Sequence, residues 1–199
     1  MRLERITDPT EQPVSLSEVK AHLRVDYSGE DTLIGALIAS ATQHMEGRHG
    51  ILGRALVTQT WDYYLDAWPV EVSGRRKRRI EIPLPPLSSV TGIYYRDTDG
   101  VEQTFSAASY NVDKRALVGG VVLKGTAQWP ALEEHPEAVR IRFVAGFGAA
   151  SAVPEPIKQA LKLLIGHWFL SREAVGQVGT PVAMAVEALT APYRTDWMA

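Results

Sequence analysis

The sequence predicts an α+β protein in which a mostly antiparallel β-sheet region is inserted into a helical core. Apolar residues recur with helical spacing before residue 50 and again after residue 154, whereas the stretch between them is rich in Thr, Val, Trp and Tyr and is divided by turn signals. We therefore expect three parts: 1–53 as the N-terminal helical part, 54–148 as the inserted β region, and 149–199 as the C-terminal helical part and tail. The two helical parts should pack together as one core.

Two helices are expected in the N-terminal part. Ser15 and Glu18 have the spacing of a capping box at the start of a short apolar stripe. A longer stripe follows the turn-like residues 27–29 and ends near Gly47. Its members are Leu33, Ile34, Leu37, Ile38, Ala41 and Met45. The two helices should form a helical hairpin.

Seven short runs in the β region have the composition of strands. They are Val57–Leu65, Arg79–Ile82, Val90–Tyr95, Val101–Phe105, Tyr110–Val112, Val121–Lys124 and Ala138–Val144. Turn signals such as Asp99-Gly100 separate them, which favours antiparallel pairing. The prolines within 83–86 lack amide donors, so this stretch should bend the chain between strands.

The strongest helical signal begins at Pro154-Glu155-Pro156, because proline is favourable in a first helical turn. Apolar residues then occupy one face as far as Trp168. Residues 176–181 should interrupt the helix, and a shorter piece is expected from Val182 to Leu189.

Composition limits the classes of function. The chain has 199 residues, with 21 Lys+Arg against 23 Asp+Glu, and this balance argues against a surface built throughout to bind a polyanion. The absence of Cys excludes disulfides, thiolate catalysis and thiolate metal sites. The start, Met1–Gln12, is polar, and no run approaches the roughly 18 apolar residues that span a bilayer, so we expect a soluble protein made and used in a cytoplasm.

No catalytic, cofactor or metal site is expected. The five His residues lack the converging spacing of metal ligands, and His167 is best interpreted as a packed side chain of the long helix. The nucleophile elbow of hydrolases is absent. Residues 97–100 fit a hairpin turn better than a calcium loop, since Ala108 stands where the last calcium ligand should be. Gly146-Phe147-Gly148 fits a strand-to-helix connection better than a dinucleotide-binding turn.

Two segments are candidates for partner contacts. Arg75, Arg76, Lys77, Arg78 and Arg79 form a run of five cations, expected at a hairpin tip, where they are either solvated or in contact with DNA phosphates or an acidic partner. The tail contains Tyr193, Arg194 and Trp197, which are residue types that anchor protein interfaces. An unstructured tail is the alternative.

Several segments stand in a characteristic order along nearly the whole chain. They are Pro13–Asp26, Glu30-Asp31 with Leu33-Ile34, Thr58–Trp61, Pro83–Leu87 with Val90, Arg140–Gly148, Val153–Ala160, His167–Phe169, Arg172-Glu173 and Ala188–Arg194. In order and spacing they resemble the head–tail connector (adaptor) proteins of long-tailed double-stranded-DNA phages, in the longer form with a β insertion. Such proteins also occur in prophages and in gene transfer agents.

The resemblance implies a structural subunit, not an enzyme, in the neck of a virion or phage-like particle assembled in the bacterial cytoplasm. It implies a homo-oligomeric ring, expected to be dodecameric, that docks on the portal protein, surrounds the DNA exit channel and meets the next neck or tail protein. Double-stranded DNA would pass without sequence-specific contact, and no membrane contact is implied. Connector C-terminal segments commonly attach to the portal, so Tyr193, Arg194 and Trp197 are the expected portal or partner contacts. The run Arg75–Arg79 is the expected contact for the DNA channel or an acidic partner.

Three other functions stay open at this stage. The chain could be another neck component, a stopper or a terminator. It could be a sheet-based nucleic-acid-binding module that uses the basic run, in which case the isolated monomer should show salt-dependent DNA binding. A hydrolase would need His44 or His167 within hydrogen-bond reach of a nucleophile.

Overall fold

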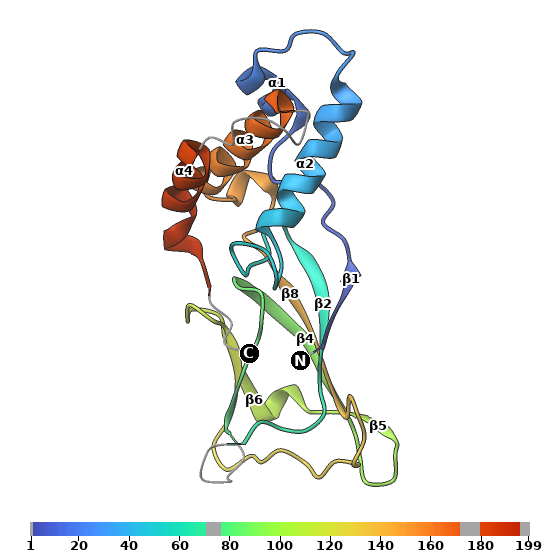
Figure 1. Ribbon diagram of the computed structural model, residues 1–199. Helices are drawn as coiled ribbons and strands as arrows, with labels where there is room; N and C mark the ends of the chain where they lie inside the picture. Colours follow the sequence, from blue (N-terminus) through green and yellow to red (C-terminus); the bar gives the residue numbers. More distant parts are fainter. Residues whose placement is uncertain (1, 71–76, 172–179, 196–199) are drawn as a thin grey trace. The chain divides into compact units, whose positions relative to one another are not determined.

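The computed structural model describes residues 2–70, 77–171 and 180–195 (Figure 1). The chain divides into two compact units, each with its own core. The sheet unit contains residues 1–8 and 58–146, and the helical unit contains residues 9–57 and 147–199. The predicted α+β class with an inserted antiparallel sheet region is confirmed.

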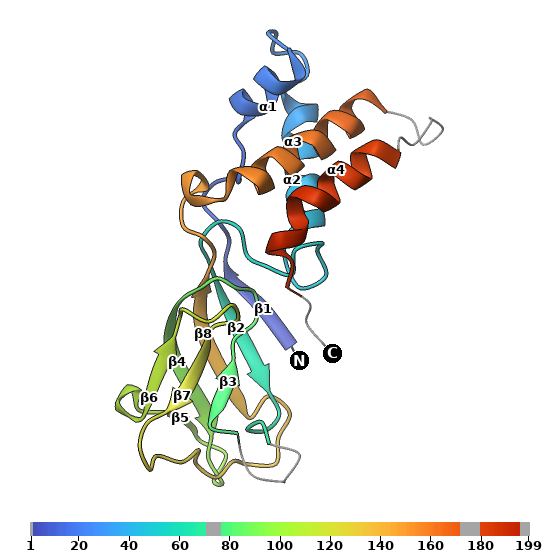
Figure 2. The ribbon, with the colours of Figure 1, turned by 90° about the vertical axis from the view of Figure 1, so that its left-hand side faces the viewer.

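The sheet unit consists of two antiparallel sheets, and Figure 2 shows the smaller sheet in front of the larger. The larger has the order β1 (Arg2–Thr7), β2 (Gln59–Leu65), β8 (Val139–Ala145), β4 (Leu87–Arg96) and β5 (Glu102–Thr104). The smaller has the order β3 (Arg79–Glu81), β7 (Gly120–Leu123) and β6 (Tyr110–Asp113), and a 3-10 turn, η1 (Ala107–Ser109), precedes β6. All seven predicted strands are present.

Strand β8 lies at the centre of the larger sheet and shows why the sequence folds this way. Its residues alternate, with Val139, Ile141, Phe143 and Ala145 fully buried and Arg140 and Arg142 on the opposite face. The register places Trp61 of β2 beside Phe143, and Ile93 of β4 beside Ile141. One face of the larger sheet is therefore apolar and the other is charged.

Strand β1 was not expected, because the polar start of the chain had been assigned to the N-terminal helical part, whereas residues 1–8 belong to the sheet unit. Five of its six residues are exposed, so it carries no apolar alternation that a sequence could reveal. It is an edge strand that is held in place by backbone pairing with β2, in which Leu3 lies opposite Tyr63. Charged side chains such as Arg2 and Glu4 are typical of edge strands that avoid pairing with other chains.

The helical unit contains four helices within the described residues. They are α1 (Leu16–Leu23), α2 (Asp31–Met45), α3 (Glu155–Leu170) and α4 (Thr180–Thr190), with 3-10 turns η2 (Ala150–Ala152) and η3 (Ala191–Tyr193). Helix α3 packs against each of the other three, and its Ile157, Leu161 and Ile165 are fully buried. None of these helices is both long and apolar enough to span a bilayer.

The predicted start of α1 is confirmed in detail. Glu18 N donates to Ser15 Oγ at 3.2 Å, and Ser15 N donates to Glu18 Oε2 at 2.7 Å, which completes the capping box. The hydrogen bonds that Ser15 N and Ser15 Oγ donate to Glu18 Oε2, both at 2.7 Å, lower the pKa of Glu18 below its ordinary value. The capping box fixes the point at which the chain enters the helical hairpin of α1 and α2.

Candidate interaction surfaces

The basic segment, residues 75–79, is only partly free for a partner. Arg75 and Arg76 lie outside the described residues. The main chain of Lys77 is fixed, because its N donates to Pro69 O at 2.7 Å and its O accepts from the Trp129 indole at 2.7 Å. Its side chain is exposed.

The two arginines that follow Lys77 bind their own sheet unit. Arg78 Nη2 donates to the carbonyls of Leu123 and Gly125 at 3.1 and 2.7 Å. Arg79 Nη1 forms an ion pair with Asp113 Oδ2 at 2.7 Å, and its Nη2 donates to Val118 O at 2.8 Å. The run is thus not a uniform cationic patch, and its last two members stabilise the smaller sheet.

We expect Arg79→Met to lower the thermal midpoint of unfolding, whereas Lys77→Met, a matched change at an exposed side chain, should leave it nearly unchanged. The hydrogen bond from Arg79 lowers the pKa of Asp113, so the pair stabilises the fold above the ordinary Asp pKa and loses this effect as pH falls. The difference between wild type and Arg79→Met, measured by circular dichroism, should shrink below about pH 4. Equal midpoints for the two variants at neutral pH would contradict this assignment.

The C-terminal segment, residues 191–195, is held against the loop before the sheet unit begins. Arg54 is buried, and its Nε donates to Tyr193 O. Thr195 N donates to Leu52 O at 3.0 Å, and the Tyr193 ring packs against the helical core. Arg194 is 44% exposed and lies 3.8 Å from Glu187 Oε1. Of the three tail candidates, Tyr193 is partly used within the fold, Arg194 is accessible, and Trp197 lies outside the described residues.

The two histidines of the hydrolase alternative both line one cavity of about 300 Å³, which is bordered by α2, α3 and α4. His44, His167, Glu187 and Arg194 line it along with apolar side chains. The one hydroxyl in the wall, Thr190 Oγ1, is buried and donates to Val186 O at 2.7 Å, so it is not placed as a nucleophile. Within the described part of the chain, no group of three or more His, Asp or Glu side chains could hold a metal ion.

Sequence reasoning missed the charged face of the larger sheet, here called the outer sheet face. Asp62 is only 1% exposed, and its two oxygens accept from Arg142 Nε and Nη2 at 2.8 and 2.7 Å. Hydrogen bonding to Asp62 raises the pKa of Arg142. Arg140 donates to both oxygens of Glu102 at 3.0 Å and stacks over the Tyr94 ring. The alternation of Arg140 and Arg142 with buried residues of β8 was the sequence signal that could have indicated this charged face.

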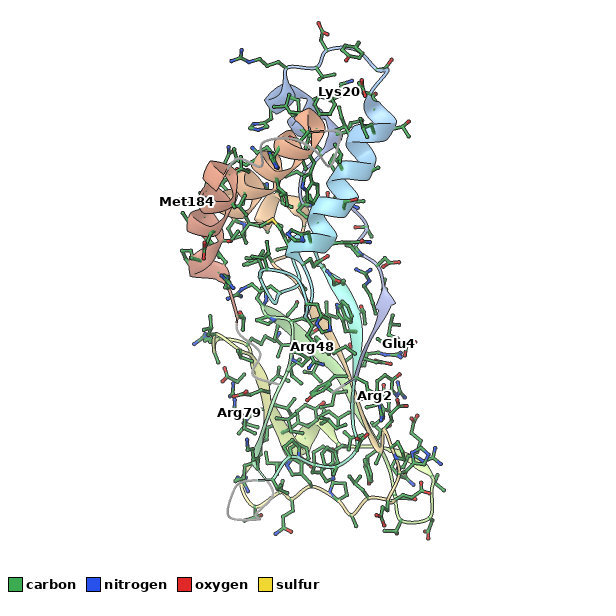
Figure 3. All side chains as sticks on the ribbon, viewed as in Figure 1. Arg2, Glu4, Lys20, Arg48, Arg79 and Met184 are labelled. Carbon is green, nitrogen blue, oxygen red and sulfur yellow. The ribbon has the colours of Figure 1, made fainter. Side chains whose placement is uncertain are left out.

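Strand β1 extends this network at the sheet edge. Tyr64 Oη donates to Glu4 Oε2 at 2.9 Å, and burial together with that hydrogen bond raises the pKa of Tyr64 to about 12. Arg2 pairs with Asp66 and Glu137 at 3.1 and 3.2 Å, and Figure 3 shows Arg2 and Glu4 along this edge. The arginines of the outer sheet face are therefore neutralised by carboxylates of the same unit.

The fold defines a class: an α+β protein in which a unit of two antiparallel sheets is inserted into a helical unit. Residues 13–73 match the family described as phage gp6-like head-tail connector proteins, which confirms the resemblance drawn from the sequence. No curated protein matches the chain.

Solved structures extend the similarity in fold to the whole chain. A chain in the neck of an empty gene transfer agent particle, computed with C6 symmetry, is 24% identical with a TM-score of 0.80, over 100% of this chain and 98% of that one. Chains in a native gene transfer agent virion, and in the neck of the native particle computed with C12 symmetry, are each 23% identical with a TM-score of 0.73 and the same coverage.

Proposed function

We propose that this chain is a structural head–tail connector subunit in the neck of a phage-like particle. The observation that carries the proposal is the fold match, which includes both units and leaves almost nothing of either chain unmatched. The match of residues 13–73 to connector proteins supports it independently, because that comparison uses sequence alone. The chain would act by holding other proteins together in the particle, not by catalysis.

The proposed assembly is a ring, dodecameric in the complete particle, between the portal and the next neck or tail protein. The C6 and C12 symmetries of the similar necks support a closed ring of identical subunits. The ring would surround the DNA exit channel. The near balance of charge along the chain and the self-neutralised outer sheet face support this role, because a strongly cationic wall would retain passing DNA.

Partner contacts are proposed at two places. Arg194, together with Tyr193 and Trp197, is proposed to contact the portal, supported by the exposure of Arg194 at the end of an ordered C-terminal segment. Lys77, with Arg75 and Arg76, is proposed to face the channel or an acidic partner, while Arg78 and Arg79 serve the fold of the sheet unit.

The test is assembly with the portal protein of the same particle. We expect the purified chain and portal to cosediment and to form rings in negative-stain images, with little DNA binding by the chain alone at physiological salt. A chain that never binds portal and never forms rings would contradict the proposal. Binding to a tail protein but not to portal would indicate a stopper or terminator instead.

A further inference from the structure

The outward face of α4 is apolar, and within residues 2–70, 77–171 and 180–195 no segment covers it. Glu187 is the one charged residue among the eleven of this helix. Val186 and Thr190 face the core, while Ala183, Met184 and Ala188 are exposed, Met184 to 66%. Figure 3 shows Met184 on the outer side of α4. A helix that is apolar on both faces is normally buried on both, so this face should be covered in the assembled state.

A complementary surface lies on α2. Between Asp31 and His44 this helix carries no charged residue. Its outward positions have small or neutral polar side chains; the exposed ones are Thr32, Ala36, Ser40 and Gln43. Beside it is a hollow of about 550 Å³, which we call the α2 hollow. Its wall combines Gly35 and the apolar Val14, Leu16, Ile38 and Ala150 with the polar Glu11, Gln12, Ser15, Glu18, Ser151 and Lys158.

The α2 hollow is open where Gly35 lies. A Cβ atom built on Gly35 would meet no other atom within 4 Å, so a side chain from another molecule could enter there. The charged groups of the wall have partners within the same chain. Lys158 is only 8% exposed and is paired with Glu155 at 3.3 Å, Glu18 accepts from Ser15 N at 2.7 Å, and Glu11 accepts from Ala150 N at 2.8 Å. The hollow can therefore accept an uncharged apolar side chain, and the flexible thioether of methionine adapts well to such a site.

The two surfaces lie on opposite sides of the helical unit. Helix α3 packs against both α2 and α4, and Figure 1 shows it between them. Two different faces on opposite sides of one subunit produce head-to-tail contacts, which close into rings when the rotation between copies allows. The charge next to the α4 face, Glu187, has its own partner in Arg194, so no unpaired charge opposes the contact.

We propose that the occupant of the α2 hollow is Met184 of a second copy of this chain, with the α4 face of one copy packed on α2 of the next. This proposal assigns the contact between neighbouring subunits of the proposed connector ring. The closure of that contact into a ring rests on the proposed function. The contact between two copies can be tested without a ring.

The absence of Cys from the sequence makes cross-linking a clean test. Met184→Cys and Gly35→Cys are purified separately with tags of different mass, mixed at high concentration and treated with a short bis-maleimide. The control mixture pairs Met184→Cys with Ala108→Cys, an exposed position of η1 in the sheet unit. We expect at least tenfold more mixed dimer with Gly35→Cys than with Ala108→Cys, and equal yields would overturn the contact. Circular dichroism should show that all three variants fold.

Ring formation on the portal protein then distinguishes a failure of the α4–α2 contact from a failure of the proposed connector function. If wild-type rings form on portal while the mixed-dimer yields are equal, the connector role stands and the α4–α2 contact is wrong. If the Gly35 pair cross-links but no portal binding or ring is found, the self-contact stands and the connector role fails.

Discussion

Replacing Phe143 with alanine is expected to lower the free energy of unfolding of the sheet unit by about 3–5 kcal/mol. Phe143 is fully buried in β8, with Trp61 of β2 on one side and Val90 of β4 on the other. Because backbone hydrogen bonds hold β8 on both edges, the neighbouring strands cannot move inward to fill the cavity. Urea unfolding followed by tryptophan fluorescence would measure the loss.

The matched control for this prediction is Val144→Ala, the next residue along β8. Val144 is on the outer sheet face and only partly buried, so its replacement should cost about 1 kcal/mol or less. Hydrogen exchange should show that amides of α2 and α3 keep most of their protection in Phe143→Ala, because the helical unit has its own core. Similar losses for the two alanine variants would contradict the central position of Phe143.

Much of the fold could be predicted because its elements carry local signals. The apolar stripe of α3 begins at a proline pair and continues for four turns, and the capping box of Ser15 and Glu18 marks the start of α1 within four residues. Alternation in β8 likewise identifies a strand with one buried face. Each of these signals depends on residues close together in the chain, which is the information that a single sequence contains.

The charged contacts could not be predicted, because their partners are far apart in the chain. Asp62 and Arg142 are 80 residues apart, and only the register between β2 and β8 brings them together. Arg79 looked like one member of a solvated basic run, yet its carboxylate partner is Asp113 of β6 in the same sheet, 34 residues later. The two candidate segments therefore stay predictions, and the contacts that Arg78, Arg79 and Tyr193 make within the fold were not visible in the sequence.

Replacing Arg54 with methionine is expected to lower the free energy of unfolding of the helical unit by about 2–3 kcal/mol. Arg54 is 6% exposed, and burial lowers the pKa of its guanidinium. Methionine keeps part of the apolar stem but leaves the Tyr193 carbonyl without its donor. The amide of Thr195, which donates to Leu52 O, should then exchange faster with solvent, and hydrogen exchange would measure this release of the C-terminal segment. Unchanged exchange at Thr195 would contradict the role of Arg54.

Arg194→Ala is the matched control for Arg54→Met, because it removes a different arginine contact of the same C-terminal segment. Arg194 and Glu187 are 44% and 71% exposed and 3.8 Å apart, so their pair should contribute between about 0 and 1 kcal/mol to stability. If the C-terminal segment contacts the portal, Arg194→Ala should weaken portal binding with almost no change in the unfolding midpoint, whereas Arg54→Met should reduce both. Portal binding that survives both substitutions would assign the segment to the fold of the helical unit alone.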